Sequence, residues 1–155
     1  MMDVDQFARP FEANKIHWRI GARTKKKDKA IPLAYIDARD VMKRLDDVCG
    51  VGGWQCRYDH VTAQGVVCSI GIFIGDEWIW KANGAGETKV EGEKGSMSDA
   101  FKRAAVLWGI GRYLYSVKIQ WKAIDEWGKF TETFELPSWA TPAGYDKLMA
   151  ERKSK

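Results

Sequence analysis

The spacing of apolar residues predicts a first amphipathic helix between Asp37 and Cys49. Apolar side chains recur there at steps of three and four residues, which places them on one helical face: Val41, Met42, Leu45, Val48 and Cys49. Asp37 suits the N-cap, because its carboxylate can accept a hydrogen bond from a backbone N–H of the first turn. Gly50 suits the end, because glycine readily adopts the backbone conformation that follows many helices.

A second and stronger helical pattern begins at Ser96 or Ser98, either of which is a suitable N-cap, and ends before Gly109. Its apolar face comprises Met97, Ala100, Phe101, Ala104, Ala105, Leu107 and Trp108. Lys102 and Arg103 fall on the opposite face. The pattern therefore predicts a helix that packs through small and aromatic side chains and exposes two adjacent bases.

Between these helices the pattern favours three strands, Trp54–Val61, Gly65–Ile74 and Glu77–Ala82. The separators are turn-sized, so an antiparallel meander is expected. In the third strand Trp78 and Trp80 fall on one side and Ile79 on the other. The following residues 83–95 are rich in glycine and charge, which predicts a loop.

The two ends of the chain carry weaker signals. Residues 1–20 are expected to form an arm with apolar anchors and a short strand over Ile16–Ile20. Lys118–Trp139 suggests a strand pair across Asp125–Lys129, and Pro142–Arg152 suggests a final helix with a basic tail. The predicted fold is thus α+β: helix, three-stranded antiparallel meander, long helix, then a strand pair and a short helix. We expect one domain over residues 1–155, with a core over 10–115, an arm over 1–9 and a tail over 142–155 whose order the sequence leaves open.

Composition narrows the class of protein. The chain has 155 residues, of which 45% are hydrophobic and 30% charged, a balance typical of a globular domain. No apolar run reaches the roughly 20 residues of a membrane span, and the start does not resemble a signal peptide, so a cytoplasmic location is expected. The three cysteines, Cys49, Cys56 and Cys68, have no metal-binding spacing. We therefore expect no metal and no cofactor, and reduced thiols at Cys56 and Cys68.

One enzymatic pattern is present. Asp76, Glu87 and Lys89 resemble the D…ExK arrangement of metal-dependent nucleases, in which two carboxylates hold a divalent cation and the lysine steadies the attacking hydroxide. So short a pattern arises easily by chance in a chain that is 30% charged. A nuclease is kept as an alternative.

Basic residues suggest a different function, the binding of a polyanion. The net charge is only +4, so an anionic partner must be met by a local patch. Between Ser96 and Lys122 there are five bases and one acid, which suits a groove that follows a phosphate backbone. The candidate contacts are Arg39, Lys94, Lys102, Arg103 and Arg112. The simpler interpretation is that Lys102 and Arg103 only keep the helix surface solvated.

A second basic segment, Arg23–Lys29, also has five bases and one acid. It is either a solvated hairpin tip or an anion-binding arm. Its lysines, Lys25, Lys26, Lys27 and Lys29, are candidates for holding a second nucleic-acid strand.

Several separated motifs resemble the Rad-fifty-two (Rad52) family of single-strand annealing proteins. Ser98–Ala105, followed by Trp108-Gly109 and Leu114-Tyr115, is similar to the family's helix signature. Upstream, Leu33–Arg39 and Gly52-Gly53-Trp54 resemble its opening helix and its entry into the sheet. The resemblance covers about residues 10–115, and the motifs occur in the family's order.

Three further motifs look like the phage and bacterial branch of that family: Pro10-Phe11, Ile16–Gly21 and Gly109–Tyr113. Two positions depart from the family pattern. Val106 stands where the eukaryotic members carry another base, and Leu107 where phage members often carry lysine. The resemblance therefore implies a groove that is weaker here or that depends on Arg112.

The resemblance implies a homo-oligomeric ring that binds single-stranded DNA and anneals complementary strands without a nucleotide cofactor, in recombination and repair. By motif position, Arg39 matches a base that contacts the DNA backbone, and Lys102 and Arg103 match the pair that lines the groove. Lys94 falls where another base often occurs. Trp54, Trp78 and Trp80 would serve the core and subunit contacts rather than base stacking. A single-strand-binding protein is a candidate partner, and a monomeric nucleic-acid-binding module without annealing activity is a further alternative.

Overall fold

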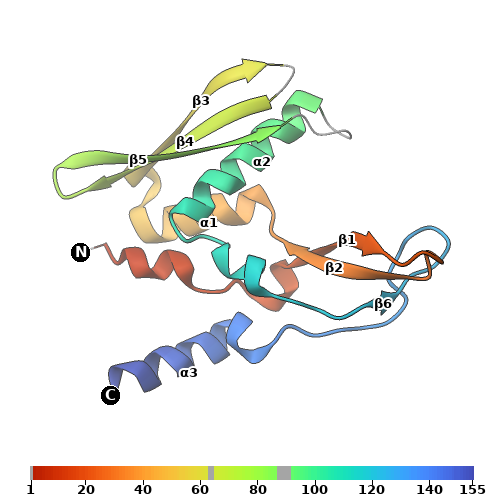
Figure 1. Ribbon diagram of the computed structural model, residues 1–155. Helices are drawn as coiled ribbons and strands as arrows, with labels where there is room; N and C mark the ends of the chain where they lie inside the picture. Colours follow the sequence, from red (N-terminus) through yellow and green to blue (C-terminus); the bar gives the residue numbers. More distant parts are fainter. Residues whose placement is uncertain (1, 63–64, 87–91) are drawn as a thin grey trace. The chain divides into compact units, whose positions relative to one another are not determined.

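The computed structural model describes residues 2–62, 65–86 and 92–155 (Figure 1). Internal contacts divide the chain into two compact units. We call Met1–Arg9 with Asp37–Arg112 the first unit, and Pro10–Ile36 with Tyr113–Lys155 the second unit. The α+β class is confirmed, with two three-stranded sheets and three α-helices in the described residues. A single domain over residues 1–155 stays a prediction.

The first unit is built on the predicted meander. Its strands are β3 (Trp54–Thr62), β4 (Gly65–Ile74) and β5 (Glu77–Gly86), in the order β3-β4-β5 with antiparallel pairing. Strand β5 continues four residues beyond the predicted end at Ala82. This extension consists of Asn83 and three small residues, which have little strand preference of their own. Pairing with the first half of β4, including Gly65 opposite Gly86, stabilises it.

Helix α1 (Ala38–Cys49) confirms the first predicted helix. The Asp37 carboxylate accepts a hydrogen bond from the Arg39 backbone N–H at 2.8 Å, as an N-cap does. Gly50 ends the helix with a φ of +76°, a conformation that glycine adopts without strain.

Helix α2 (Gly92–Leu107) begins before either predicted cap, so the prediction of Ser96 or Ser98 as N-cap is wrong. Ser96 is instead an interior residue and only 2% exposed. Its hydroxyl donates a hydrogen bond to the Gly86 carbonyl oxygen at 2.9 Å, which joins the first turns of α2 to the end of β5. Of the predicted loop over residues 83–95, residues 83–86 belong to β5 and residues 92–95 to α2, and the remaining five residues lie outside the described ranges.

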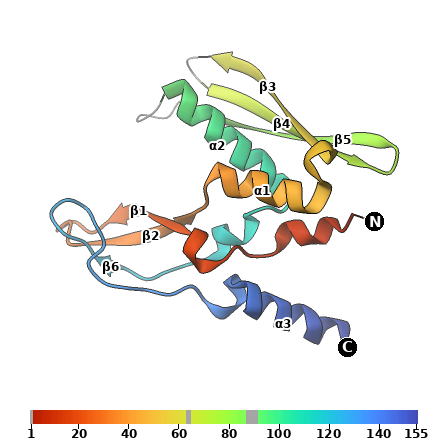
Figure 2. The same cartoon turned by 180° about the vertical axis from the view of Figure 1, so that it is seen from behind.

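The core of the first unit lies between α2 and one face of the sheet. Helix α2 runs along that face and packs against β4 and β5 (Figure 2). Alternate residues of β4 point toward it and are buried: Val66, Cys68, Ile70 and Ile72. On the helix, four of the predicted apolar residues are buried: Ala100, Phe101, Ala104 and Ala105. The predicted apolar face is therefore the packing face.

The N-terminal segment is anchored in this unit. The 3₁₀ helix η1 (Val4–Ala8) buries Phe7 completely, with its ring 6.2 Å from that of Trp108. Arg44 of α1 donates to three backbone carbonyl oxygens of the segment, those of Gln6, Phe7 and Arg9. The predicted arm over residues 1–9 thus contains a short helix held by the core.

The second unit contains a sheet that only part of the sequence pattern predicts. Its strands are β1 (His17–Arg23), β2 (Lys29–Tyr35) and β6 (Lys122–Ala123), in the order β1-β2-β6. The predicted strand near Ile16–Ile20 is confirmed, and residues 24–28 form the turn that follows it. Whether this turn is only solvated or binds an anion stays open. Strand β2 was not predicted, because Leu33–Arg39 resembles the opening helix of the Rad52 family. Only the last two residues of that range are helical.

The predicted C-terminal strand pair is present only at its turn. Asp125 donates its backbone N–H to the Lys129 carbonyl oxygen at 2.8 Å, and an isolated bridge joins Ile124 to Phe130. The residues before this turn pair with β2 instead of forming a long hairpin of their own. The predicted final helix is confirmed as α3 (Pro142–Lys153), with the Thr141 hydroxyl as its cap. The remaining short helices are η2 (Ala13–Lys15), η3 (Val51–Gly53), η4 (Arg112–Ser116) and η5 (Ser138–Ala140).

Candidate nucleic-acid interface

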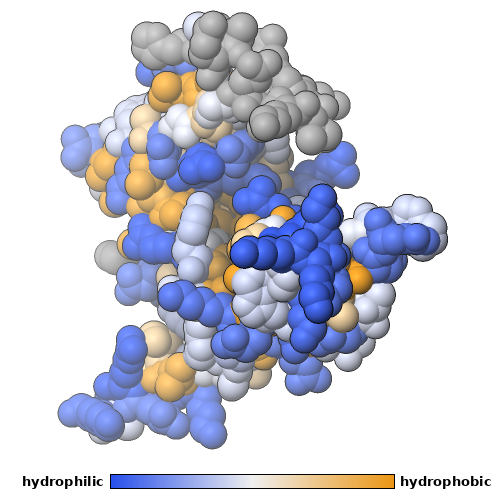
Figure 3. Space-filling view, turned by 45° about the vertical axis from the view of Figure 1, so that its right-hand side comes forward, coloured by the Kyte–Doolittle hydropathy of each residue, from blue (hydrophilic) through white to orange (hydrophobic). Residues whose placement is uncertain are grey.

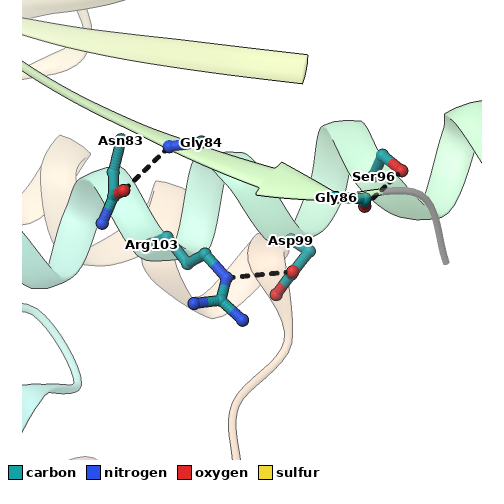
Figure 4. Close-up of polar contacts among 6 residues, drawn as sticks. All are labelled: Asn83, Gly84, Gly86, Ser96, Asp99 and Arg103. Carbon is teal, nitrogen blue, oxygen red and sulfur yellow. Dashed lines mark hydrogen bonds and ion pairs between the residues drawn. The ribbon is translucent and has the colours of Figure 1, made fainter. Parts of the chain in front are cut away.

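The solvent face of α2 carries the two bases that the sequence singled out. Lys102 is half-buried and Arg103 is exposed. The Nε of Arg103 donates to Asp99 Oδ2 at 3.0 Å, one helical turn earlier (Figure 4). These two side chains are 49% and 37% exposed, and an ion pair so accessible to water contributes at most about 1 kcal/mol. A phosphate group can therefore compete with Asp99 for the guanidinium.

The C-terminal end of α2 is capped by Arg112. Its Nε donates to the Val106 carbonyl oxygen at 3.0 Å, and its Nη2 donates to the Leu107 carbonyl oxygen at 2.9 Å. A positive charge is favourable there, because the last carbonyl groups of a helix carry a partial negative charge. The two bonds use two of the five guanidinium donors and fix the position of the charge.

A second cation, Lys81 of β5, meets Arg112 at the same carbonyl. Its Nζ donates to the Leu107 carbonyl oxygen at 3.3 Å and lies 4.5 Å from the centre of the Trp108 ring. That ring is itself held by a hydrogen bond from Trp108 Nε1 to the Ile70 carbonyl oxygen at 3.1 Å. We call Lys81, Lys102, Arg103 and Arg112 the basic strip.

The electrostatics of this end favour an anion. A helix terminus supplies roughly half an elementary charge, whereas Lys81 and Arg112 bring two full positive charges to one carbonyl oxygen. The net charge at this end of α2 is therefore positive. Arg103 lies about 6 Å from Leu107 along the helix axis, toward the N-terminus of α2, at a rise of 1.5 Å per residue. The part of the basic strip between Arg103 and the end of α2 alone therefore corresponds to about two nucleotides of one strand.

Comparison with known proteins identifies the family. The description "Rad52/22 family double-strand break repair protein" matches residues 4–69 and 66–127, most of the chain. The chain belongs to the Rad52/22 family. It is also 38% identical over 144 residues to "Single-stranded DNA-binding protein DdrA" of Deinococcus deserti, covering 86% of this chain and 67% of that protein. The protein of the same name from Deinococcus radiodurans is 35% identical over 140 residues, and the match covers 86% of this chain and 64% of that protein. The chain thus spans about two thirds of the length of these relatives.

The other predicted DNA contacts, whether they came from the Rad52 resemblance or from local charge, are placed less closely together. Arg39 is exposed in the first turn of α1, a helix that packs against α2 in the same unit. The side chain of Lys94 lies outside the described residues. Lys25, Lys26, Lys27 and Lys29 are exposed in the second unit, at the turn between β1 and β2. Of the predicted contacts, the structure joins Arg112 to the end of α2 and leaves Arg39 on a neighbouring helix.

Lys81 is the residue that sequence analysis missed in this Rad52/22 family member. Its signal was present, because strand alternation puts position 81 on the same side as Ile79 and opposite Trp80. The register confirms this: Lys81 pairs with the buried Ile70, and Asn83 pairs with the buried Cys68. Both β5 side chains therefore start from the face that α2 covers, and Figure 4 shows Asn83 on the side from which Arg103 projects.

The tryptophans of the sheet serve different faces. Trp54 faces the core side, where its Nε1 donates to Asp46 Oδ1 at 2.7 Å. Trp78 and Trp80 lie on the opposite face, with ring centroids 6.3 Å apart. The ring of Trp80 covers Gly71, and the Arg57 guanidinium lies 4.2 Å from its centroid. Trp54 thus serves the core, as expected, whereas a role of Trp78, which is 38% exposed, in subunit contacts stays a prediction.

The nuclease alternative receives no support from the described residues. Asp76 is exposed in the turn that begins β5, and Gly86 ends that strand ten residues later, about 30 Å away. Glu87 and Lys89 lie outside the described residues. In the parts of the chain that the structure describes, no three or more His, Cys, Asp or Glu residues are grouped to hold a metal ion. Nor does any described helix have the length and apolar character needed to cross a membrane.

The thiols belong to the scaffold. Cys56 of β3 and Cys68 of β4 lie on the core side, and both are free. A hydrogen bond from the Cys68 thiol lowers the pKa of Cys56 to about 7 and raises that of Cys68 itself. Burial, followed by the nearby Asp46 carboxylate, raises the pKa of Cys49 to about 11. Cys68 is completely buried, whereas Cys56 is half-buried.

Proposed function

We propose that this protein binds single-stranded DNA along the basic strip and anneals complementary strands, without a nucleotide cofactor, as a homo-oligomeric ring. Membership of a family named for double-strand break repair supports a role in repair and recombination. The names of the two DdrA relatives support single-stranded DNA as the ligand.

The observation that carries the proposal is the meeting of Lys81 and Arg112 at the Leu107 carbonyl, one turn beyond Lys102 and Arg103. Charges fixed on a helix and a strand can hold phosphates at set positions. Phosphate contacts position a strand without reading its sequence, so the base edges stay free to pair with a second strand. This is the property that annealing requires.

A single protomer supplies only a short binding path. Symmetric repetition would join such paths into a continuous one and convert weak contacts into a stable complex. If each protomer neutralises about five phosphates, each protomer contributes about −3.5 to the slope of the logarithm of the binding constant against the logarithm of salt concentration. Such steep salt dependence is expected for the intact assembly.

The test is to mix complementary labelled oligonucleotides with the protein, with no nucleotide present, and to follow duplex formation together with particle mass by light scattering. We expect faster duplex formation and particles of many times 17.6 kDa. Particles of 17.6 kDa that bind DNA without speeding duplex formation would identify a monomeric binding module. Strand breakage that requires magnesium would identify a nuclease instead.

A further inference from the structure

Two turns lie side by side at one end of the second unit. The turn between β1 and β2 spans residues 24–28, and the second turn spans Asp125–Lys129. Lys29 pairs with Ala123, and the backbone N–H of Ile124 donates to the Asp28 carbonyl oxygen at 2.9 Å. A Cβ built on Gly128 would lie 3.1 Å from Arg23 Nη2, so Arg23 also touches the second turn. We call residues 23–29 and 125–129 together the paired turns.

The paired turns are strongly basic on the β1–β2 side. Five bases and one acid occur between Arg23 and Lys29, and all six of these side chains are exposed. The one acid is occupied within the turn, because Asp28 Oδ1 accepts a hydrogen bond from the Thr24 hydroxyl at 2.7 Å. That bond, followed by a backbone hydrogen bond and the charges of Lys26 and Lys29, lowers the pKa of Asp28. Within the described part of the chain, no ion pair joins the four lysines of this turn to an acid.

The second turn contributes an aromatic ring and one more base. The side chain of Trp127 is 77% exposed, the largest value for any described tryptophan. Its turn is nonetheless ordered, because Asp125 Oδ1 accepts the backbone N–H groups of both Trp127 and Lys129, at 2.9 and 2.8 Å. Of the acids there, Asp125 is engaged in these bonds and Glu126 is exposed. In Figure 3, the face that includes this end of the second unit shows predominantly hydrophilic side chains.

A tryptophan this exposed contributes little to folding and leaves a large apolar surface in water. Exposed aromatic rings beside cations are the features by which proteins hold single-stranded nucleic acid, since bases stack on the rings while phosphates meet the charges. Duplex DNA offers no free base faces, and an acidic protein segment offers no planar bases to stack. The combination favours an unpaired DNA strand as the ligand.

We infer that the paired turns form a second binding site for single-stranded DNA, in which Trp127 stacks on a base while Arg23, Lys129 and the four lysines of the β1–β2 turn hold the adjoining phosphates. Trp127 and Lys129 thereby join a site for which the sequence indicated only lysines. The role of this site in holding an incoming strand rests on the proposed annealing function. Its ability to bind single-stranded DNA does not.

The experiment uses the full chain carrying Lys102→Ala and Arg103→Ala, so that binding to the basic strip is weakened and the paired turns dominate. In this background, Trp127→Ala is compared with Trp127→Phe, which keeps an aromatic ring, and with Trp139→Ala, which removes another exposed tryptophan of the same unit. The probes are a 20-nucleotide oligothymidylate and inorganic polyphosphate, which has charge but no bases. Fluorescence anisotropy at low salt measures the binding of labelled DNA, and competition measures that of polyphosphate.

Loss of a stacked base costs roughly fivefold to a hundredfold in affinity. We expect Trp127→Ala to weaken oligothymidylate binding at least fivefold and to leave polyphosphate binding unchanged. Trp127→Phe and Trp139→Ala should bind oligothymidylate about as tightly as the variant that carries only Lys102→Ala and Arg103→Ala. Unchanged oligothymidylate binding would overturn the inference, as would an equal loss for both probes or no measurable binding by the background variant. Failure of the unmodified protein to bind single-stranded DNA would instead overturn the proposed function.

Discussion

The basic strip and the paired turns present positive charge in different ways. In the strip, Lys81 and Arg112 are held by carbonyl groups at the end of α2, and Arg103 is held by Asp99 on the helix itself. In the paired turns, the lysines project from a tight turn, and the exposed ring of Trp127 belongs to the neighbouring turn. Charges fixed on regular secondary structure lose little further side-chain entropy on binding, whereas each free lysine loses more.

This difference indicates two modes of DNA binding. The basic strip is suited to a phosphate backbone that stays bound, because its charges are already in place. The paired turns are suited to a strand that is captured and released, because mobile lysines bind weakly and one stacked base adds a limited contribution. Annealing needs both, one strand held firmly and another tested against it. The following predictions would separate or merge these two roles.

The largest expected effect is on first-strand binding by the basic strip. Lys102→Ala combined with Arg103→Ala should lower affinity for single-stranded DNA at least tenfold and make the salt slope less steep by about 1.4, because two phosphate contacts are lost. Arg152→Ala combined with Lys153→Ala removes the same charge from an exposed helical pair in α3 and should change affinity less than twofold. Light scattering should show an unchanged particle; a collapsed assembly would mean that the pair has a structural role.

The next effect concerns the paired turns and the second strand. Lys25→Gln, Lys26→Gln and Lys29→Gln together should slow annealing about tenfold and weaken first-strand binding less than twofold. Lys27 is left in place because its φ of +58° makes substitutions there harder to interpret. The matched control is Lys147→Gln, Arg152→Gln and Lys153→Gln in α3. Annealing at the unmodified rate would remove the second-strand role of this turn.

A smaller loss is expected at Lys81, the strip residue that the sequence did not reveal. Lys81→Ala should weaken single-stranded DNA binding about threefold to fivefold and change the salt slope by about 0.7, the amount for one phosphate. Lys81→Arg should restore most of the affinity. Lys43→Ala, which removes an exposed lysine of α1, is the control. An equal effect of both alanine variants would show that Lys81 acts only through general charge.

The smallest effect on binding is expected at Ser96, which joins α2 to β5. Ser96→Ala leaves the Gly86 carbonyl oxygen without its hydroxyl donor and should lower the free energy of unfolding by about 1–2 kcal/mol, measured by urea denaturation. Binding at temperatures well below unfolding should change less than twofold. A large loss of affinity without a loss of stability would mean that this hydrogen bond sets the geometry of the basic strip.

The amphipathic elements of the first unit were predictable because their signals are local. Helix α1 was predicted with its cap at Asp37, and the bounds of β4 match the pattern over Gly65–Ile74. The signals failed where pairing overrides composition. Residues 83–86 have the glycine content of a loop, yet they form the end of β5 because β4 offers them hydrogen-bonding partners.

The residues of the candidate sites also divide into those with a local sequence signal and those whose role depends on contacts distant in sequence. Lys102 and Arg103 were found from helical periodicity, and Lys25–Lys29 from charge density along the chain. Lys81 and Trp127 were not found. Strand alternation gives only the side of the sheet on which Lys81 lies, and nothing local shows that this lysine reaches a helix end or that a turn tryptophan stays in water. Their importance depends on neighbours that are distant in sequence, Leu107 for Lys81 and the β1–β2 turn for Trp127.

By itself, the sequence determined which residues form the main helices and strands, which helix face is apolar and which segments are basic. These properties depend on side chains two, three or four positions apart, so a short stretch of sequence is enough to determine them. Only the tertiary structure decided which side of β5 meets α2, that two cations share one carbonyl, and that two turns almost a hundred residues apart lie together. Such contacts depend on strand register and helix packing, which arise from the balance of interactions over the whole folded unit.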